Sequence, residues 1–186
     1  MTSSLLRVDP FEVVAEDRTL ELVCGEISER ASPRFGHSRA QLRFARLLAN
    51  LDSDDPDDVD GWWFGVEPDC VDGRETLYRP DVAGWRRTTL PEPPVGRVQV
   101  RPDWIAEILS PGHEAYDRVT KRNLYHRLGV GHLWLVSVED RVVEAFRRTP
   151  EGWQLVAAVT DGEPAVLEPF PVPVVVGSLF LPRRRG

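Results

Sequence analysis

The chain has 186 residues, 41% of them hydrophobic and 28% charged, so it can form one substantial core, and we expect a single domain over residues 1–186. Its formal net charge of −7 argues against a protein that coats nucleic acid through charge alone. The two cysteines lack CxxC spacing, so we expect neither a disulfide framework nor a zinc site. The sequence has no signal-peptide pattern, and no run approaches the roughly 18 apolar residues of a membrane helix, so we expect no membrane partner. These features favour a soluble, cytoplasmic protein.

The first 35 residues are predicted to form a short helix and a hairpin. Asp9-Pro10 is typical of a helix cap followed by proline at the first helical position, and the helix should reach about Ala15. The segments 20–23 and 26–29 flank Cys24-Gly25, which indicates a β-hairpin.

The segment 36–138 is predicted to be the core. Apolar residues at helical spacing predict an amphipathic helix from about 36 to 51, and six aspartates within 52–60 predict an exposed loop. Strands, a helix and a further strand should follow in this order: strands 62–67, 77–85 and 104–109, helix 117–128, strand 132–138.

Residues 139–186 are predicted to add strands 142–147 and 153–159 as a meander. The tail, 165–181, is interrupted by prolines and should be an edge strand or a packing arm. The fold class is therefore α/β (α+β), with a core in the order helix, three strands, helix, strand.

Glu107 is the first candidate site residue, because it lies in the otherwise apolar run Trp104–Leu109. Burying a carboxylate there would cost several kcal/mol unless a basic side chain, hydrogen-bond donors or a metal ion compensates it. Lys121 is the only lysine among 23 Lys and Arg residues and could be that partner. A purely structural buried ion pair is the alternative interpretation.

Asp81 is the second candidate, because Arg79-Pro80-Asp81 precedes a strand-forming run. Proline is tolerated at the start of a strand, and consecutive strands commonly pair, so Asp81 and Glu107 could form a hard oxygen site that suits Mg²⁺.

Asp117, Lys121 and Tyr125 are spaced four apart and should share one helix face. Asp117 is equally interpreted as a helix N-cap, and Tyr125 as a core aromatic. Beside two carboxylates, the Lys121 ammonium could orient an attacking water or stabilise charge developing on a phosphate.

Several motifs, taken in order, resemble the Uma-two family, a restriction-endonuclease family of the PD-(D/E)XK nuclease superfamily. The resemblance runs from about Asp9 to Phe180. It rests on these strings: Leu20 to Glu26, Pro33 to His37, Arg79-Pro80-Asp81, Glu107 to Pro111, Asp117-x3-Lys121-x3-Tyr125 and Gly129 to Val136.

The resemblance implies a restriction-endonuclease-like core, with Asp81, Glu107 and the carbonyl of Ile108 as metal ligands and Lys121 as the basic residue. It also implies that Glu21 could join the metal shell, although a solvent-facing hairpin residue is the alternative. His37 would be an accessory residue or only a helix-start contact.

The sequence departs from the family pattern at three positions. Leu109 occupies the superfamily's usual lysine position, so Lys121 would reach in from the helix instead. Cys24 and Ser137 stand where the family usually has aspartate.

We therefore expect an Mg²⁺-dependent endodeoxyribonuclease, with Mn²⁺ as a substitute, that acts on DNA and could be a homodimer. Short arginine clusters at Arg86-Arg87, Arg147-Arg148 and Arg183 to Arg185 could touch DNA phosphates. The alternatives are a catalytically silent module that binds nucleic acid or protein, and a metal-dependent hydrolase of another phosphoester.

Overall fold

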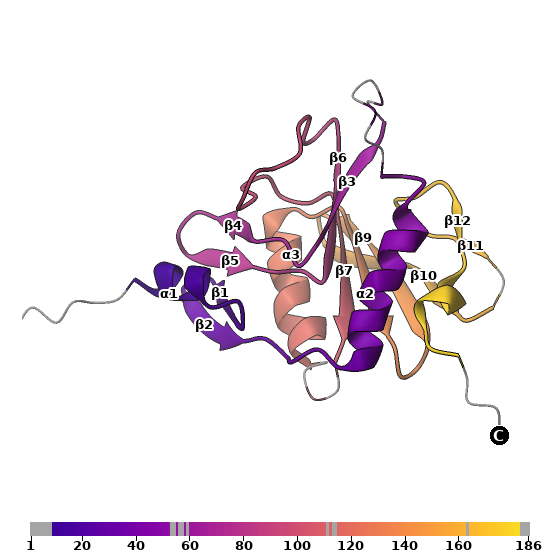
Figure 1. Ribbon diagram of the computed structural model, residues 1–186, viewed down its shortest axis with the longest axis horizontal. Coiled ribbons are helices and arrows are strands. Elements are labelled where there is room, and N and C mark those ends of the chain that lie inside the picture. Colours follow the sequence, from indigo (N-terminus) through magenta and orange to yellow (C-terminus); the bar gives the residue numbers. More distant parts are fainter. Residues whose placement is uncertain are drawn as a thin grey trace, which may run out of the picture.

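The computed structural model describes residues 9–182 except 53, 54, 56, 57, 59, 111, 113, 114 and 163. Its centre is a six-stranded sheet in the order β10-β9-β8-β7-β6-β3 (Figure 1). Strands β7 and β8 are parallel, and the other neighbouring pairs are antiparallel. The strands are β3 (Trp62–Val66), β6 (Val82–Arg86), β7 (Trp104–Leu109), β8 (His132–Ser137), β9 (Val142–Thr149) and β10 (Gly152–Thr160).

Helices cover both faces of this sheet, because strand side chains alternate between the two faces. Trp104, Ala106 and Ile108 of β7 pack in the cluster that contains helix α2 (Phe35–Leu48). The intervening Ile105 and Leu109 pack in the cluster that contains helix α3 (Arg122–Leu128). The sheet therefore separates two apolar cores.

A smaller sheet, in the order β2-β1-β5-β4, lies beside the central one. Helix α1 (Pro10–Glu16) covers it, with Phe11 and Val14 packed on Leu22 and Leu77. The predicted hairpin is confirmed. The strands of this sheet are β1 (Leu20–Val23), β2 (Glu26–Glu29), β4 (Cys70–Asp72) and β5 (Thr76–Tyr78).

The predicted strand 77–85 is wrong, because the chain forms two strands there that belong to different sheets. The break falls at Arg79-Pro80-Asp81. Arg79 is fully buried and donates hydrogen bonds to the carbonyls of Val14 and Leu20 and to Asp69, so it holds the chain in the small sheet before β6 begins. Strand β4 was not predicted.

The predicted helix 117–128 begins instead with a π-helical turn, η1 (Tyr116–Lys121), which continues into α3. Asp117 lies inside this turn, so its interpretation as an N-cap is wrong; Ala115 occupies the cap position. Gly129, in the left-handed region at φ 81°, ends α3 as predicted.

The C-terminal tail is a packing arm. Strands β11 (Ala165–Val166) and β12 (Pro173–Val174) pair only with each other, and the 3₁₀ turn η2 (Val176–Leu179) follows. Buried apolar side chains join the arm to the core on the α2 side of the sheet. These side chains are Leu167, Phe170, Val174, Val176, Leu179 and Phe180.

Several predictions lie partly or wholly outside the described residues. These are five positions of the 52–60 loop and the arginine cluster at 183–185. Within the described part of the chain, the structure has no helix that is both long and apolar enough to cross a membrane.

Candidate functional site

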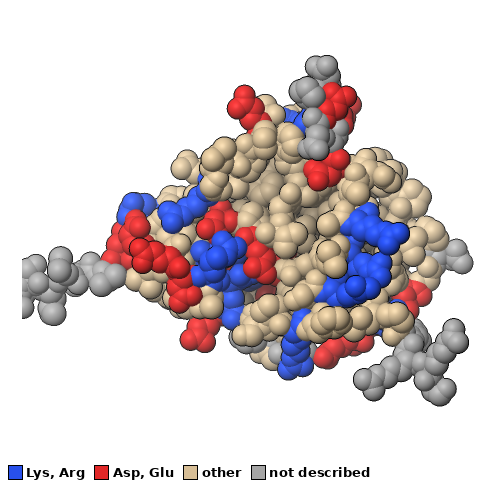
Figure 2. Space-filling model, viewed as in Figure 1, with Lys and Arg blue, Asp and Glu red and all other residues tan. Residues whose placement is uncertain are grey.

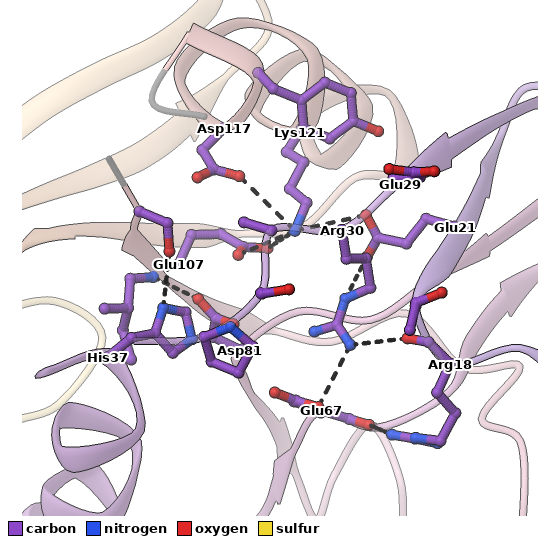
Figure 3. Close-up of a pocket in the computed structure, with 17 residues that line it drawn as sticks. Arg18, Glu21, Glu29, Arg30, His37, Glu67, Asp81, Glu107, Asp117 and Lys121 are labelled. Carbon is purple, nitrogen blue, oxygen red and sulfur yellow. Dashed lines mark hydrogen bonds and ion pairs between the residues drawn. The ribbon is translucent and has the colours of Figure 1, made fainter. Parts of the chain in front are cut away.

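A pocket of about 240 Å³ opens where the C-terminal end of β7, the residue before β6, the start of α2, the β1–β2 hairpin and η1 meet (Figure 3). Seven of the eight predicted site residues line it. These are Glu21, His37, Asp81, Glu107, Ile108, Asp117 and Lys121. Tyr125, the eighth, is fully buried and contacts Glu107.

Lys121 reaches from the last residue of η1 to the Glu107 carboxylate on β7. Its Nζ donates to Oε2 at 3.2 Å and to Oε1 at 3.3 Å, and the Tyr125 hydroxyl also donates to Oε1. The same Nζ lies 3.6 Å from Glu21 Oε2 and 3.9 Å from Asp117 Oδ1. One buried ammonium therefore faces three carboxylates, as Figure 3 shows.

Asp81 is fixed by two contacts at the point where the chain enters β6. Its Oδ2 accepts the backbone N–H of Ile108 at 2.7 Å, and its Oδ1 lies 3.1 Å from His37 Nε2. The other ring nitrogen of His37 lies 3.2 Å from Ser110 Oγ. His37 comes from the first turn of α2, so this helix bears directly on the site.

Glu21 is buried, with 1% of its surface exposed, so its interpretation as a solvent-facing hairpin residue is wrong. One carboxylate oxygen accepts the Arg79 backbone N–H at 2.8 Å and lies 3.7 Å from Arg30 Nε. The other faces Lys121. The carboxylate points into the pocket because β1 pairs with β2 and β5 in the small sheet.

Glu67 is a site residue that the sequence reasoning missed. It follows β3, its backbone N–H donates to the Asp81 carbonyl, and its carboxylate accepts from Gln41 at 3.0 Å and from Arg30 at 3.4 Å. Oxygen or nitrogen atoms of His37, Glu67 and Asp81 all lie within 4.8 Å of one another, close enough to hold a common cation. Knowledge of the register between β3 and β6, which sets Val66 opposite Val82, would have placed Glu67 beside Asp81.

The surroundings of Asp81 favour its charged form. Burial alone would raise the pKa of Asp81, but the hydrogen bond from His37 and the charges of His37 and Lys121 outweigh burial and lower that pKa below its ordinary value. Burial would lower the pKa of His37, but the hydrogen bond to Asp81 and the Asp81 charge raise it. A cation can therefore find an ionised carboxylate here.

The surroundings of Glu107 shift its pKa in the direction opposite to that of Asp81. Burial raises the pKa of Glu107 well above its ordinary range, and the carboxylates of Asp81, Asp117 and Glu21 add to the shift, while Lys121 opposes it. Burial would lower the pKa of Lys121, but the surrounding carboxylates, led by Glu107, raise it. Lys121 is therefore a permanent cation that holds an otherwise unfavourable carboxylate cluster together.

The donor set suits a hard divalent cation. Carboxylate oxygens and water are the usual ligands of Mg²⁺, and an imidazole nitrogen beside them is compatible with Mn²⁺. The pocket also provides a fixed positive charge, the Lys121 ammonium, beside these carboxylates, and such a charge can stabilise an anionic ester.

Comparisons with known proteins identify the family and the fold. A family model described as "Putative restriction endonuclease" matches residues 6–175. Among solved structures, the chain is similar to a protein from Anabaena variabilis ATCC 29413, titled a "putative nuclease belonging to DUF820", with a TM-score of 0.66 and 20% identity over 86% of this chain and 88% of that one. No curated protein matches the sequence. The predicted mixed α/β fold is thereby confirmed.

Proposed function

This chain belongs to the Uma2 family, and we propose that it is an Mg²⁺-dependent endonuclease that hydrolyses phosphodiester bonds of DNA. The observation that carries the proposal is the meeting of Asp81 and Glu107 from neighbouring strands with the buried Lys121 ammonium in one open pocket. Family membership supports a nuclease, and the pocket supports a metal-assisted one.

Asp81, Glu107 and the carbonyl of Ile108 would hold the Mg²⁺ ion, for which Mn²⁺ could substitute. Glu67 and His37 border Asp81 closely enough to contribute, and Glu21 would add a further carboxylate. A divalent cation bound there would act as a Lewis acid on the phosphodiester.

The chain's own residues supply the remaining chemistry. The Lys121 ammonium stabilises negative charge that develops on the phosphate, and it does so strongly because it is largely shielded from solvent. Tyr125 and Lys121 fix the Glu107 carboxylate, and the Ile108 N–H fixes Asp81, so little reorganisation is needed as the substrate binds.

We further propose that residues 1–186 act as one domain in the cytoplasm, and that cleavage of both DNA strands would use a homodimer. The support for the homodimer is chemical, since one pocket of about 240 Å³ can hold one scissile phosphate at a time. A monomer would nick duplex DNA.

A plasmid assay with and without Mg²⁺ tests the function, using Asp81→Asn and Lys121→Ala. Each change should lower the cleavage rate by at least about a hundredfold, because each removes a ligand or a stabilising charge at the reacting phosphate. Asp72→Asn is the matched control, because Asp72 is exposed on β4 outside the pocket. Cleavage that survives in both site variants would refute the assignment.

The same experiment separates the alternatives. A catalytically silent module would bind DNA or protein without any Mg²⁺-dependent nicking. A hydrolase of other phosphoesters would turn over a small phosphodiester such as bis(4-nitrophenyl) phosphate and leave plasmid intact.

A further inference from the structure

The outer face of α2 carries a row of arginines that the proposed catalytic chemistry does not use. Residues 30–51 contain five arginines and no acidic residue, in a chain whose net charge is −7. Three of the five, Arg39, Arg43 and Arg46, are spaced four and three apart, so they share one helix face. Figure 2 shows the basic surface gathered along α2.

The inner face of the same helix explains why the arginines point outward. Ala40, Phe44 and Leu48 are buried against the sheet, and His37 and Gln41 turn toward the pocket. The three arginines lie outside this buried face, because 3.6 residues complete one helical turn: Arg46 is exposed, and Arg39 and Arg43 are half-buried. We call Arg39, Arg43 and Arg46 the α2 ridge.

The charges of the ridge are not compensated within the described part of the chain, where none of the three forms an ion pair. Other arginines are compensated: Arg147 pairs with Glu168, and Arg141 pairs with Asp161. The ridge is therefore a local excess of positive charge on an acidic protein.

Two ridge residues also line a groove between α2 and the C-terminal arm. Arg43, Arg46 and Leu47 form one wall, and Pro173, Val175 and Ser178 form the other. The groove is open and bordered by two guanidinium groups and a hydroxyl, which are donors that suit phosphate oxygens. Among the residues that the structure describes, no carboxylate lines this groove.

We propose that the α2 ridge binds the phosphate backbone of the DNA that flanks the scissile phosphodiester. The inference rests on the proposed nuclease function, because α2 connects the ridge to the pocket: His37, in its first turn, contacts Asp81. The ridge tracks phosphates without reading bases, so it contributes affinity and position rather than sequence preference.

The dimensions agree with this role. From His37 to Arg46 the helix rises about 13.5 Å at about 1.5 Å per residue. Phosphates follow one another about every 3.4 Å along one strand of a duplex, so the distance from His37 to Arg46 covers about four phosphates, and the ridge itself, about 10.5 Å from Arg39 to Arg46, covers about three. The contacts should therefore lie within about four nucleotides of the cleaved bond.

The test compares binding of a fluorescent DNA duplex by the wild type and by the triple variant Arg39→Ala/Arg43→Ala/Arg46→Ala, in EDTA, by anisotropy at several salt concentrations. The dissociation constant should rise at least about tenfold, and the slope of log affinity against log salt should flatten by about two to three, since each phosphate contact contributes about 0.9. The triple Arg→Lys variant keeps the charges and should retain the wild-type slope.

The matched control is Arg97→Ala/Arg101→Ala/Arg127→Ala, which removes the same charge from exposed residues before β7 and in α3 that line neither the pocket nor the groove. It should bind DNA within about twofold of the wild type. Thermal melting of each variant shows whether the fold is intact, since Arg46 also lies in the last turn of α2, where a cation favours the helix.

The outcomes separate this proposal from the nuclease proposal. Three results would each overturn the proposal that the ridge binds DNA. The folded ridge variant could keep the wild-type affinity and salt slope, the control could lose as much affinity as the ridge variant, or the wild type could fail to bind DNA at low salt. Loss of binding in the ridge variant alone supports it. If Asp81→Asn then cleaves as fast as the wild type, the catalytic assignment fails while the ridge stands.

Discussion

Lys121 is the residue on which the pocket's electrostatics depend, because it is the one ammonium among Glu107, Glu21 and Asp117. An ion pair buried this deeply is weak evidence for stability by itself, since desolvation offsets most of the attraction. Removal of one partner is different, because the remaining charge keeps its desolvation cost. The cluster therefore makes Lys121 structurally necessary even before any substrate binds.

Lys121→Met should lower the free energy of unfolding by about 3 kcal/mol at neutral pH, because it leaves Glu107 and Glu21 buried without their cation. Glu107→Gln in the same chain should restore part of the loss. Urea denaturation in EDTA measures both, and Arg39→Met, which removes a charge without an ion pair, is the control. A Lys121→Met change of less than about 1 kcal/mol would contradict the expectation.

The loss should also depend on pH in a known direction. Burial raises the pKa of Glu107, so its folded form binds a proton at a pH where an exposed glutamate has lost it. The destabilisation of Lys121→Met should therefore shrink as the pH falls and grow as it rises.

Among the elements, β6 matters most to the site, because Asp81 precedes it and it pairs with β3 and β7. Gly84 lies at its middle, between the rings of Phe64 and Trp104. A Cβ there would come 2.8 Å from Phe64 and 3.2 Å from Trp104. The glycine thus lets two aromatic side chains pack directly over the strand backbone.

Gly84→Ala should destabilise the protein by about 1–3 kcal/mol, since the added methyl group displaces rings in a packed core. Gly65→Ala on β3 is the control, because its Cβ would meet neighbours only at 3.4 Å or more. Chemical denaturation of both variants gives the comparison. Equal stability of the two would mean that the rings yield without cost.

Elements with a strong local pattern could be predicted from the sequence, and those set by tertiary contacts could not. The β1–β2 hairpin, α2, β7 and β8 follow from periodicity and turn residues. The break between β5 and β6 depends on the buried contacts of Arg79 with segments distant in the sequence, which no local pattern reveals.

The same distinction applies to the site. Glu107 could be predicted as a site residue because a carboxylate in an apolar strand needs a partner, and Lys121 is that partner in the structure. Glu67 was missed, because its closeness to Asp81 depends on the register of β3 against β6. Strand register depends on pairing across the sheet, so a single sequence predicts it poorly.

At the scale of the whole molecule, the central sheet separates two cores, and the pocket lies at the C-terminal end of β7, where elements from both faces meet. α2 reaches the pocket from one face, and η1 reaches it from the other. Anything that loosens either face should therefore disturb the site. The C-terminal arm is a remote test of this coupling, because it packs on the α2 face and contributes no residue to the pocket.

Deletion of residues 163–186 should abolish cooperative unfolding. It removes six buried apolar side chains of the arm, each contributing about 1.5–3 kcal/mol on burial, a sum comparable with the whole stability of a typical domain. It would also expose Trp104 and Trp134, whose rings pack on Phe170 and on Phe44. Deletion of 183–186 alone keeps the arm through Pro182 and should leave the melting temperature unchanged, as differential scanning calorimetry can establish. A sharp transition at the wild-type temperature in the longer deletion would show that the α2 face holds without its arm.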